Sequence, residues 1–146
     1  MSWLPKKTVV VPVDFSTASA DALQTALQLV ARPKDLHVIH VAPSPAVAMI
    51  YGDVLAIAGP LTSRLVEASE HLARFLCERG AAGVTSLVRE GDPGLMIADY
   101  ADEVHADLIV MPSHGYHGVK RLLLGSVTER VLRHANCPVL VLRRPE

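Results

Sequence analysis

The sequence predicts an α/β protein in which a five-stranded parallel sheet carries helices on both faces, a three-layer, doubly wound arrangement. The first observation is that short runs of β-branched and aliphatic residues alternate with segments of helical spacing along the whole chain. The second is that half of the residues are hydrophobic although only 4% are aromatic, so the core is aliphatic. Such a composition suits a sheet that is buried between two layers of helices.

Five strands and four helices are expected, and turn or capping signals separate them. The apolar runs that predict strands are residues 8–13, 36–41, 84–89, 107–111 and 138–142. The expected helices open or are capped at Ser16 or Thr17, at Pro60, at Asp92 with Pro93, and at Ser126. Pro33 stops the first helix and Gly80 the second. The apolar stretch 46–59 has no clear period and is expected to form a mobile loop that can include a helical turn.

Composition limits the class of protein. A length of 146 residues fits one domain, 1–146. The net charge is -1 and no run of one sign occurs, so the sequence has no basic segment of the kind that binds nucleic acid. No apolar run approaches the roughly 20 residues of a membrane span, and the first residues lack the apolar core of a secretory signal. Cys77 and Cys137 are interpreted as small buried hydrophobes rather than a disulfide. We therefore expect a cytoplasmic protein with no nucleic-acid or membrane partner.

Ligands of open parallel sheets bind beyond the carboxyl ends of the strands. Asp14 follows the first expected strand, and a loop with three glycines follows Met111 at the end of the fourth. Glycines let backbone amides approach phosphate oxygens, and the helix that starts after Gly125 adds a positive dipole end. A purely structural role is also open to these residues, because Ser126 and Glu129 have the spacing of a capping box. Asp14 could likewise contribute to the cap of the next helix.

The same segment resembles the signature of the universal stress protein family: a glycine, two residues, a glycine, nine residues, then glycine with serine or threonine. Gly115, Gly125 and Ser126 match it. The flanks also match, with DLIVM before the loop, GSVTERVLRHANCPVLVLRR after it, and PVD at residues 12–14. The resemblance covers nearly the whole chain. It implies a Rossmann-like sheet similar to that of the adenine nucleotide α-hydrolases.

The resemblance further implies a ligand, a site and a partner. In ATP-binding members the adenine lies near the first two strands and the phosphates lie on the glycine loop and the last helix. Carried over by position, the site residues are Pro12, Val13, Asp14, Val41, Met111, His114, Gly115, Gly125, Ser126, Val127 and Thr128. The expected cofactor is ATP, accompanied by Mg²⁺. The expected partner is a second copy, paired through the last strand at Pro138, Val139, Leu140, Val141 and Leu142.

Pro112 departs from the family pattern, because it stands where the signature has its first glycine. Proline has no amide hydrogen, so any contact made through that amide is lost. This favours a second hypothesis, a dimeric stress-response interaction module that binds no nucleotide. A third, an enzyme of the α-hydrolase superfamily, would need substrate-handling residues that are not recognisable. No P-loop lysine or general base is evident, so we expect a regulatory stress-response protein with slow ATP hydrolysis at most.

Two further site types are disfavoured. A response regulator would need an acceptor aspartate after the third strand and a lysine after the fifth, where this chain has REG at 89–91 and arginines at 143–144. His114 and His117 are three residues apart in a loop, but no third ligand lies at motif distance, so no metal site is expected. His37 and His40 are three apart on a strand and are expected to point to opposite faces.

Overall fold

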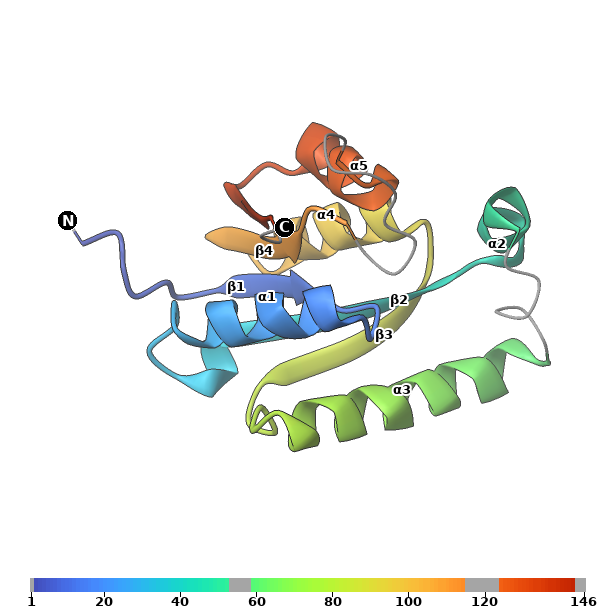
Figure 1. The fold of residues 1–146 in the computed structure, drawn as a ribbon, viewed down its shortest axis with the longest axis horizontal. Coiled ribbons are helices and arrows are strands. Elements are labelled where there is room, and N and C mark those ends of the chain that lie inside the picture. The colour runs from blue at the N-terminus through green and yellow to red at the C-terminus, as the bar shows by residue number, and fades with distance from the viewer. Residues whose placement is uncertain (1, 53–58, 115–123, 144–146) are drawn as a thin grey trace.

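The structure, a computed structural model, describes residues 2–52, 59–114 and 124–143, and it confirms the predicted fold class (Figure 1). Five strands form one parallel sheet in the order β3-β2-β1-β4-β5. The strands are β1 (Val9–Pro12), β2 (Leu36–Pro43), β3 (Thr85–Gly91), β4 (Leu108–Pro112) and β5 (Val139–Leu142). The helices are α1 (Thr17–Leu27), α2 (Pro45–Tyr51), α3 (Leu61–Glu78), α4 (Pro93–Glu103) and α5 (Ser126–His134), with a 3-10 turn η1 (Pro33–Asp35).

The sheet is buried between two helical layers. Val9 and Val11 of β1 point into a core with residues of α1 and α3, while Val10 points into a second core with residues of α4 and α5. This alternation follows from the two-residue period of a strand. Because both faces are covered, all three valines are fully buried and the strand is a continuous apolar run.

The order of the strands places a switch point between β1 and β4. From β1 the chain moves outward to β2 and β3, and it then returns to the other side of β1 to form β4 and β5. Helices that follow β1 and β4 leave from opposite faces of the sheet, so a crevice opens beyond the carboxyl ends of these strands. Asp14, which follows β1, and Met111, near the end of β4, lie at this edge.

Most of the predicted caps are present. Ser16 caps α1 by accepting from the Ser19 amide at 3.1 Å, and Asp92 caps α4 by accepting from the Leu95 amide at 3.1 Å. Gly80 takes the left-handed conformation at the end of α3, with a φ of 67°. The predicted cap at Ser126 is wrong. Gly125 is the N-cap of α5 without a side-chain bond, and Ser126 is the first helical residue.

The interpretation of 46–59 as a loop is also wrong in part, because α2 occupies residues 45–51. Ser44 caps this helix, Pro45 takes its first position, and Gly52 ends it in the left-handed conformation. A helix this short has too few turns to show an apolar period, which explains why its signal was missed. The rest of that stretch, 53–58, lies outside the described residues.

The long helix α3 is buried over only part of its length. Leu72, Phe75 and Leu76 are buried, whereas the first residue, Leu61, is 43% exposed. Figure 1 shows the reason, because the N-terminal half of α3 extends beyond the sheet toward α2. Cys77 is exposed and the expectation of a buried thiol there is wrong, since it lies on the solvent side of this helix. Cys137 is half-buried, and both thiols are free.

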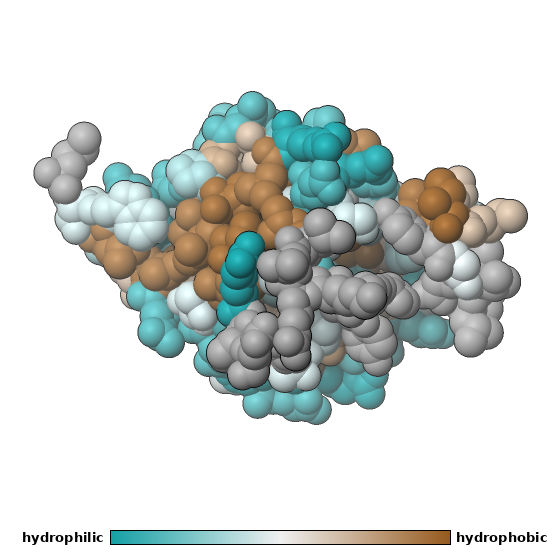
Figure 2. Space-filling view, turned by 45° about the horizontal axis from the view of Figure 1, so that its top comes forward, coloured by the Kyte–Doolittle hydropathy of each residue, from teal (hydrophilic) through white to brown (hydrophobic). Residues whose placement is uncertain are grey.

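The strand β5 forms one edge of the sheet, and each of its four residues is half-buried. Leu140 and Leu142 pack at the margin of the core that contains α1 and α3, and Val139 packs at the margin of the other core. Figure 2 shows a continuous apolar area on the side of the molecule that carries α5. Within the described ranges, no helix has both the length and the apolar character needed to cross a bilayer.

We expect Gly94→Ala to destabilise the protein by roughly 1–3 kcal/mol through overpacking. A Cβ atom at Gly94 in α4 would lie 2.6 Å from the Cβ of Arg130 in α5, so the two helices would have to separate. At an open helical position the same change would instead stabilise by about 0.5–1 kcal/mol. Urea unfolding measures the difference, with Asp99→Ala on the exposed side of α4 as the control. An unchanged or raised unfolding free energy for Gly94→Ala would contradict the close approach.

Candidate functional site

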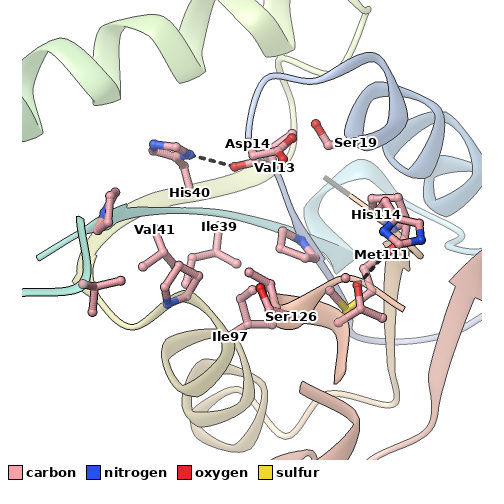
Figure 3. A pocket seen from close by; sticks show the side chains of 18 of the residues that line it. Val13, Asp14, Ser19, Ile39, His40, Val41, Ile97, Met111, His114 and Ser126 are labelled. Atoms are coloured by element: carbon pink, nitrogen blue, oxygen red, sulfur yellow. Dashed lines mark hydrogen bonds between the residues drawn. The ribbon is translucent and has the colours of Figure 1, made fainter. Parts of the chain in front are cut away.

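A cavity of about 700 Å³ lies at the carboxyl edge of the sheet, at the switch point between β1 and β4. This volume is within the roughly 300–1,000 Å³ typical of small-molecule sites. Its wall comes from the ends of β1, β2 and β4, from α2, and from the starts of α4 and α5. Figure 3 shows Ile39, Val41 and Ile97 on one side of this space and Met111 and His114 on the other, with Ser126 between them.

The structure brings together every predicted site residue that lies in the described part of the chain. The residues of that set that line the cavity are Pro12, Val13, Asp14, Val41, Met111, His114, Gly125, Ser126, Val127 and Thr128. Gly115 lies outside the described residues, as does His117. The grouping follows from the rule that the carboxyl ends of parallel strands meet at one edge. Ligand binding by these residues stays a prediction.

One half of the cavity is apolar. At its end lies an open peptide edge, which is the backbone N–H and C=O of Val41 on the side where β1 has ended. The last bond between β1 and β2 runs from the Val13 amide to the Ile39 carbonyl, at 2.9 Å. In a parallel ladder, alternate residues direct both peptide groups to the same side. Val41, two residues beyond Ile39, therefore directs its N–H and C=O toward the place that β1 has vacated. The side chains of Val47 and Ile97 line the same half.

Asp14 lines the cavity and also fixes the start of α1. Its Oδ1 accepts from the Ser16 amide at 3.0 Å and from the Ser16 hydroxyl. The Ser16 hydroxyl oxygen in turn accepts from the Ser19 amide. The two interpretations of Asp14 are therefore compatible, because the residue supports the cap of α1 from a position on the cavity wall.

The start of α5 is held close to the end of β4 by two hydrogen bonds. The Gly125 amide donates to the Ser113 carbonyl at 2.7 Å, and the buried Thr128 hydroxyl donates to the Pro112 carbonyl at 2.9 Å. These two donors are used inside the protein. The amides of the first helical turn, from Ser126 to Thr128, have no intrahelical acceptor and form the positive end of the helix dipole. An anion in the cavity would meet those amides.

Gly125 lies in close contact with the end of β4, since a Cβ atom there would lie 3.1 Å from the Ser113 carbonyl oxygen and that backbone would have to move slightly. Pro112 fits the strand for a different reason. The Ser113 amide donates to the Leu142 carbonyl of β5, so the ring nitrogen of the preceding residue, Pro112, points the other way, toward β1. Because β1 ends at that level, the proline removes no bond of the ladder.

His40 is a cavity residue that the sequence analysis did not select. Its Nδ1 lies 2.7 Å from the Val13 carbonyl oxygen (Figure 3). A carbonyl can only accept, so Nδ1 carries the proton and donates. Burial lowers the pKa of His40, and the nearby His71 lowers it further, whereas the bond to Val13 and the charge of Asp14 oppose this shift. The ring is therefore neutral at pH 7.

Other lining residues were also missed, among them Val47, Ala48 and Ser19, and the reason differs between them. Val47 and Ala48 belong to α2, which was interpreted as a loop, and Ser19 lies inside α1 where no ligand signal exists. His37 is directed away from the cavity, because its Nδ1 lies 2.8 Å from the Tyr100 hydroxyl of α4. His37 and His40 thus point to opposite faces, as predicted. Among the residues that the structure describes, no group of three potential ligands could hold a metal ion.

Comparisons with known proteins bear on this site. A family model described as the universal stress protein family matches residues 6–143. Universal stress protein MJ0531 of Methanocaldococcus jannaschii is 35% identical over 143 residues, covering 96% of this chain and 84% of that protein. Universal stress protein YxiE of Bacillus subtilis is 29% identical, covering 92% of this chain and 97% of that protein.

Solved structures give the same result. The structure of MJ0577, a universal stress protein of the same archaeon, has a TM-score of 0.77 at 27% identity and covers 98% of this chain and 99% of that one. A universal stress protein solved in complex with cAMP has a TM-score of 0.60 at 28% identity and covers 94% of this chain and 97% of that one.

We expect the unfolding free energy to fall as the pH is lowered from 7 to about 5, and His40→Gln to reduce that fall. The pKa of His40 in the folded protein is below its ordinary value, so the unfolded chain binds the proton first. The stabilisation is complete above the unfolded pKa of about 6.5 and is lost as the pH drops through the folded pKa. Burial also lowers the pKa of His37. This residue therefore adds to the loss of unfolding free energy at low pH, equally in both proteins.

Urea unfolding at several pH values measures this dependence. Glutamine keeps a side-chain donor for the Val13 carbonyl but does not titrate. Identical pH profiles for the two proteins would contradict a buried, neutral His40.

Proposed function

This chain belongs to the universal stress protein family, and we propose that it is a cytoplasmic stress-response regulator that binds an adenine nucleotide in the cavity at the carboxyl edge of its sheet. The observation that carries the proposal is the pairing of two features in one cavity. An apolar slot with the open peptide edge of Val41 lies at one end, and the first turn of α5 lies at the other. A nucleotide needs both kinds of surface, joined by a polar link.

The slot has the chemistry that adenine requires. An adenine ring is flat and apolar on its faces, and its edge carries a donor, the N6 amine, next to an acceptor, N1. Val41 directs an amide donor and a carbonyl acceptor to one side, which matches that edge. Ile39, Ile97 and Met111 supply aliphatic contacts for the faces of the ring. Asp14 supplies carboxylate oxygens that can accept from a ribose hydroxyl.

The phosphate end uses backbone rather than lysine. The amides of Ser126, Val127 and Thr128 point out of the start of α5, where the helix dipole favours negative charge. If the ligand is ATP, Mg²⁺ would accompany it and would neutralise part of the phosphate charge. We place the function in regulation because the described wall is largely apolar and its His40 and Thr128 side chains are engaged in structural hydrogen bonds.

A second function is supported by a specific observation. The Gly125 amide bonds to the Ser113 carbonyl, and Pro112 offers no amide at all, so fewer donors remain for phosphates. This arrangement favours an interaction module that works without a nucleotide. The cAMP complex of a related universal stress protein, which carries a single phosphate, favours nucleotide binding.

We expect titration calorimetry to show saturable 1:1 binding of ATP with Mg²⁺, of AMP or of cAMP, and weaker binding of GTP, whose base edge has the opposite donor and acceptor pattern. A double variant Gly115→Val and Ser126→Val should lose the binding, because it alters two positions of the family signature and the added side chain at 126 crowds the start of α5. Ser69→Val, on the exposed face of α3, is the matched control. A folded wild-type protein that binds none of these nucleotides would leave the interaction module as the better account.

We also propose that the protein is a homodimer through β5. The Pro138 carbonyl accepts from Ile109 and the Leu142 carbonyl accepts from Ser113, so these residues and Leu140 face β4. Val139 and Val141 consequently direct their peptide groups to the open edge. An apolar edge strand with unpaired peptide groups favours pairing with another chain.

We expect Val141→Pro to convert the dimer to a monomer in light scattering, while the far-UV circular dichroism stays unchanged. Proline deletes only an outward amide at this position, and edge strands tolerate that loss. Val141→Ala keeps the amide and should remain dimeric. A monomeric wild-type protein, or a Val141→Pro variant that stays dimeric, would rule out pairing through this edge.

A further inference from the structure

Phe15, directly after Asp14, is held in an aromatic stack that joins the cavity to α3. Its ring lies 3.8 Å from the ring of His71, centroid to centroid, with the two planes 13° apart. On the side of the cavity, the centroid of His40 lies at 4.5 Å. Phe75 approaches edge-on at 5.5 Å. His40 lines the cavity, whereas His71 belongs to α3 and is exposed.

The backbone at Phe15 is unusual, and the stack accounts for it. Phe15 has a φ of 65°, in the left-handed region that side chains with a Cβ disfavour. Such a conformation persists where the surroundings over-determine it. Here the Val13 carbonyl is bound by His40, Asp14 by Ser16, and the Phe15 ring by two imidazoles. The whole turn 13–15 is therefore fixed from three directions.

The α3 side of this stack is open to solution. A second, smaller cavity of about 340 Å³ lies there, lined by Phe15, His71, Arg74, Phe75, Glu78 and Arg79. Phe15 thus touches solvent-accessible space on the surface of α3, while the residue before it lines the main cavity. A displacement of turn 13–15 would be transmitted to an exposed helix face by direct contact.

We propose that Phe15 is the positioning residue of the nucleotide site. When a ligand binds in the cavity, the His40–Phe15–His71 stack shifts and changes the exposed face of α3. The inference rests on the proposed nucleotide function. It adds the contacts through which nucleotide binding in the cavity changes the surface of the protein. Asp14 is the group that touches the ligand, and Phe15 and His71 act through it. A partner that reads the state of the protein would then do so at α3.

The first experiment measures affinity in three variants by calorimetry with ATP and Mg²⁺, or with AMP if that binds more tightly. We expect His71→Ala to weaken binding by about twofold to tenfold, the range that an aromatic pair supports. His71→Phe keeps the stack and should restore the affinity. Glu70→Ala, at the preceding exposed position of α3, should have no effect. Equal affinities for His71→Ala and wild type would overturn the proposal.

A double-mutant cycle tests whether the effect passes through Asp14. In an Asp14→Asn background, which keeps an oxygen acceptor for Ser16, His71→Ala should cause no further loss of affinity. Additive losses would show that His71 affects binding by another route and would overturn the positioning role.

A spectroscopic readout separates positioning from simple destabilisation. We expect the imidazole protons of His71 to shift in proton NMR when the nucleotide saturates the site, while those of exposed His105 stay in place. Wild-type binding without a shift at His71 would overturn this inference and leave the nucleotide function intact. Absence of binding by the wild-type protein would overturn both.

Discussion

The early end of β1 is the constraint on which the site depends. β1 stops at Pro12 and turns away at Phe15, whereas its neighbour β2 continues to Pro43. Beyond the bond from Val13 to Ile39, β2 has lost its partner on that side. The result is a slot with aliphatic walls and an unpaired peptide edge at one end. Had β1 run two residues further, its backbone would have filled the space and satisfied that edge.

The opposite wall depends on close contacts between the end of β4 and the starts of two helices. Gly125 lets the Ser113 carbonyl approach, and Thr128 ties the first turn of α5 to Pro112. Gly94 lets α4 lie against Arg130 of α5, whose guanidinium also pairs with Asp92. Small residues and buried hydrogen bonds thus bring two helix starts to the cavity. The same bonds use donors that a bound phosphate would otherwise meet.

This balance links the two functional hypotheses, which concern the same cavity. The chain has the apolar slot and the helix start that a nucleotide needs, yet it engages Gly125 and Thr128 internally and has proline at position 112. Membership of the universal stress protein family accounts for the sheet and for the placement of the site. The His40–Phe15–His71 stack connects the wall of that cavity with the exposed face of α3 by direct ring contacts.

The sequence by itself determined the strands and most helix caps, because periodicity and capping signals are local patterns. Parallel connection placed Asp14 and the loop after Met111 at the carboxyl edge, and the family resemblance implied the other site residues. Only the tertiary structure decided that 45–51 is helical, that Ser126 lies inside α5 rather than at its cap, and that Cys77 is exposed. It alone brought His40 to Val13, Phe15 to His71, and Thr128 to Pro112. The physical reason is that these contacts join residues far apart in the chain, and local patterns carry no information on which distant groups will meet.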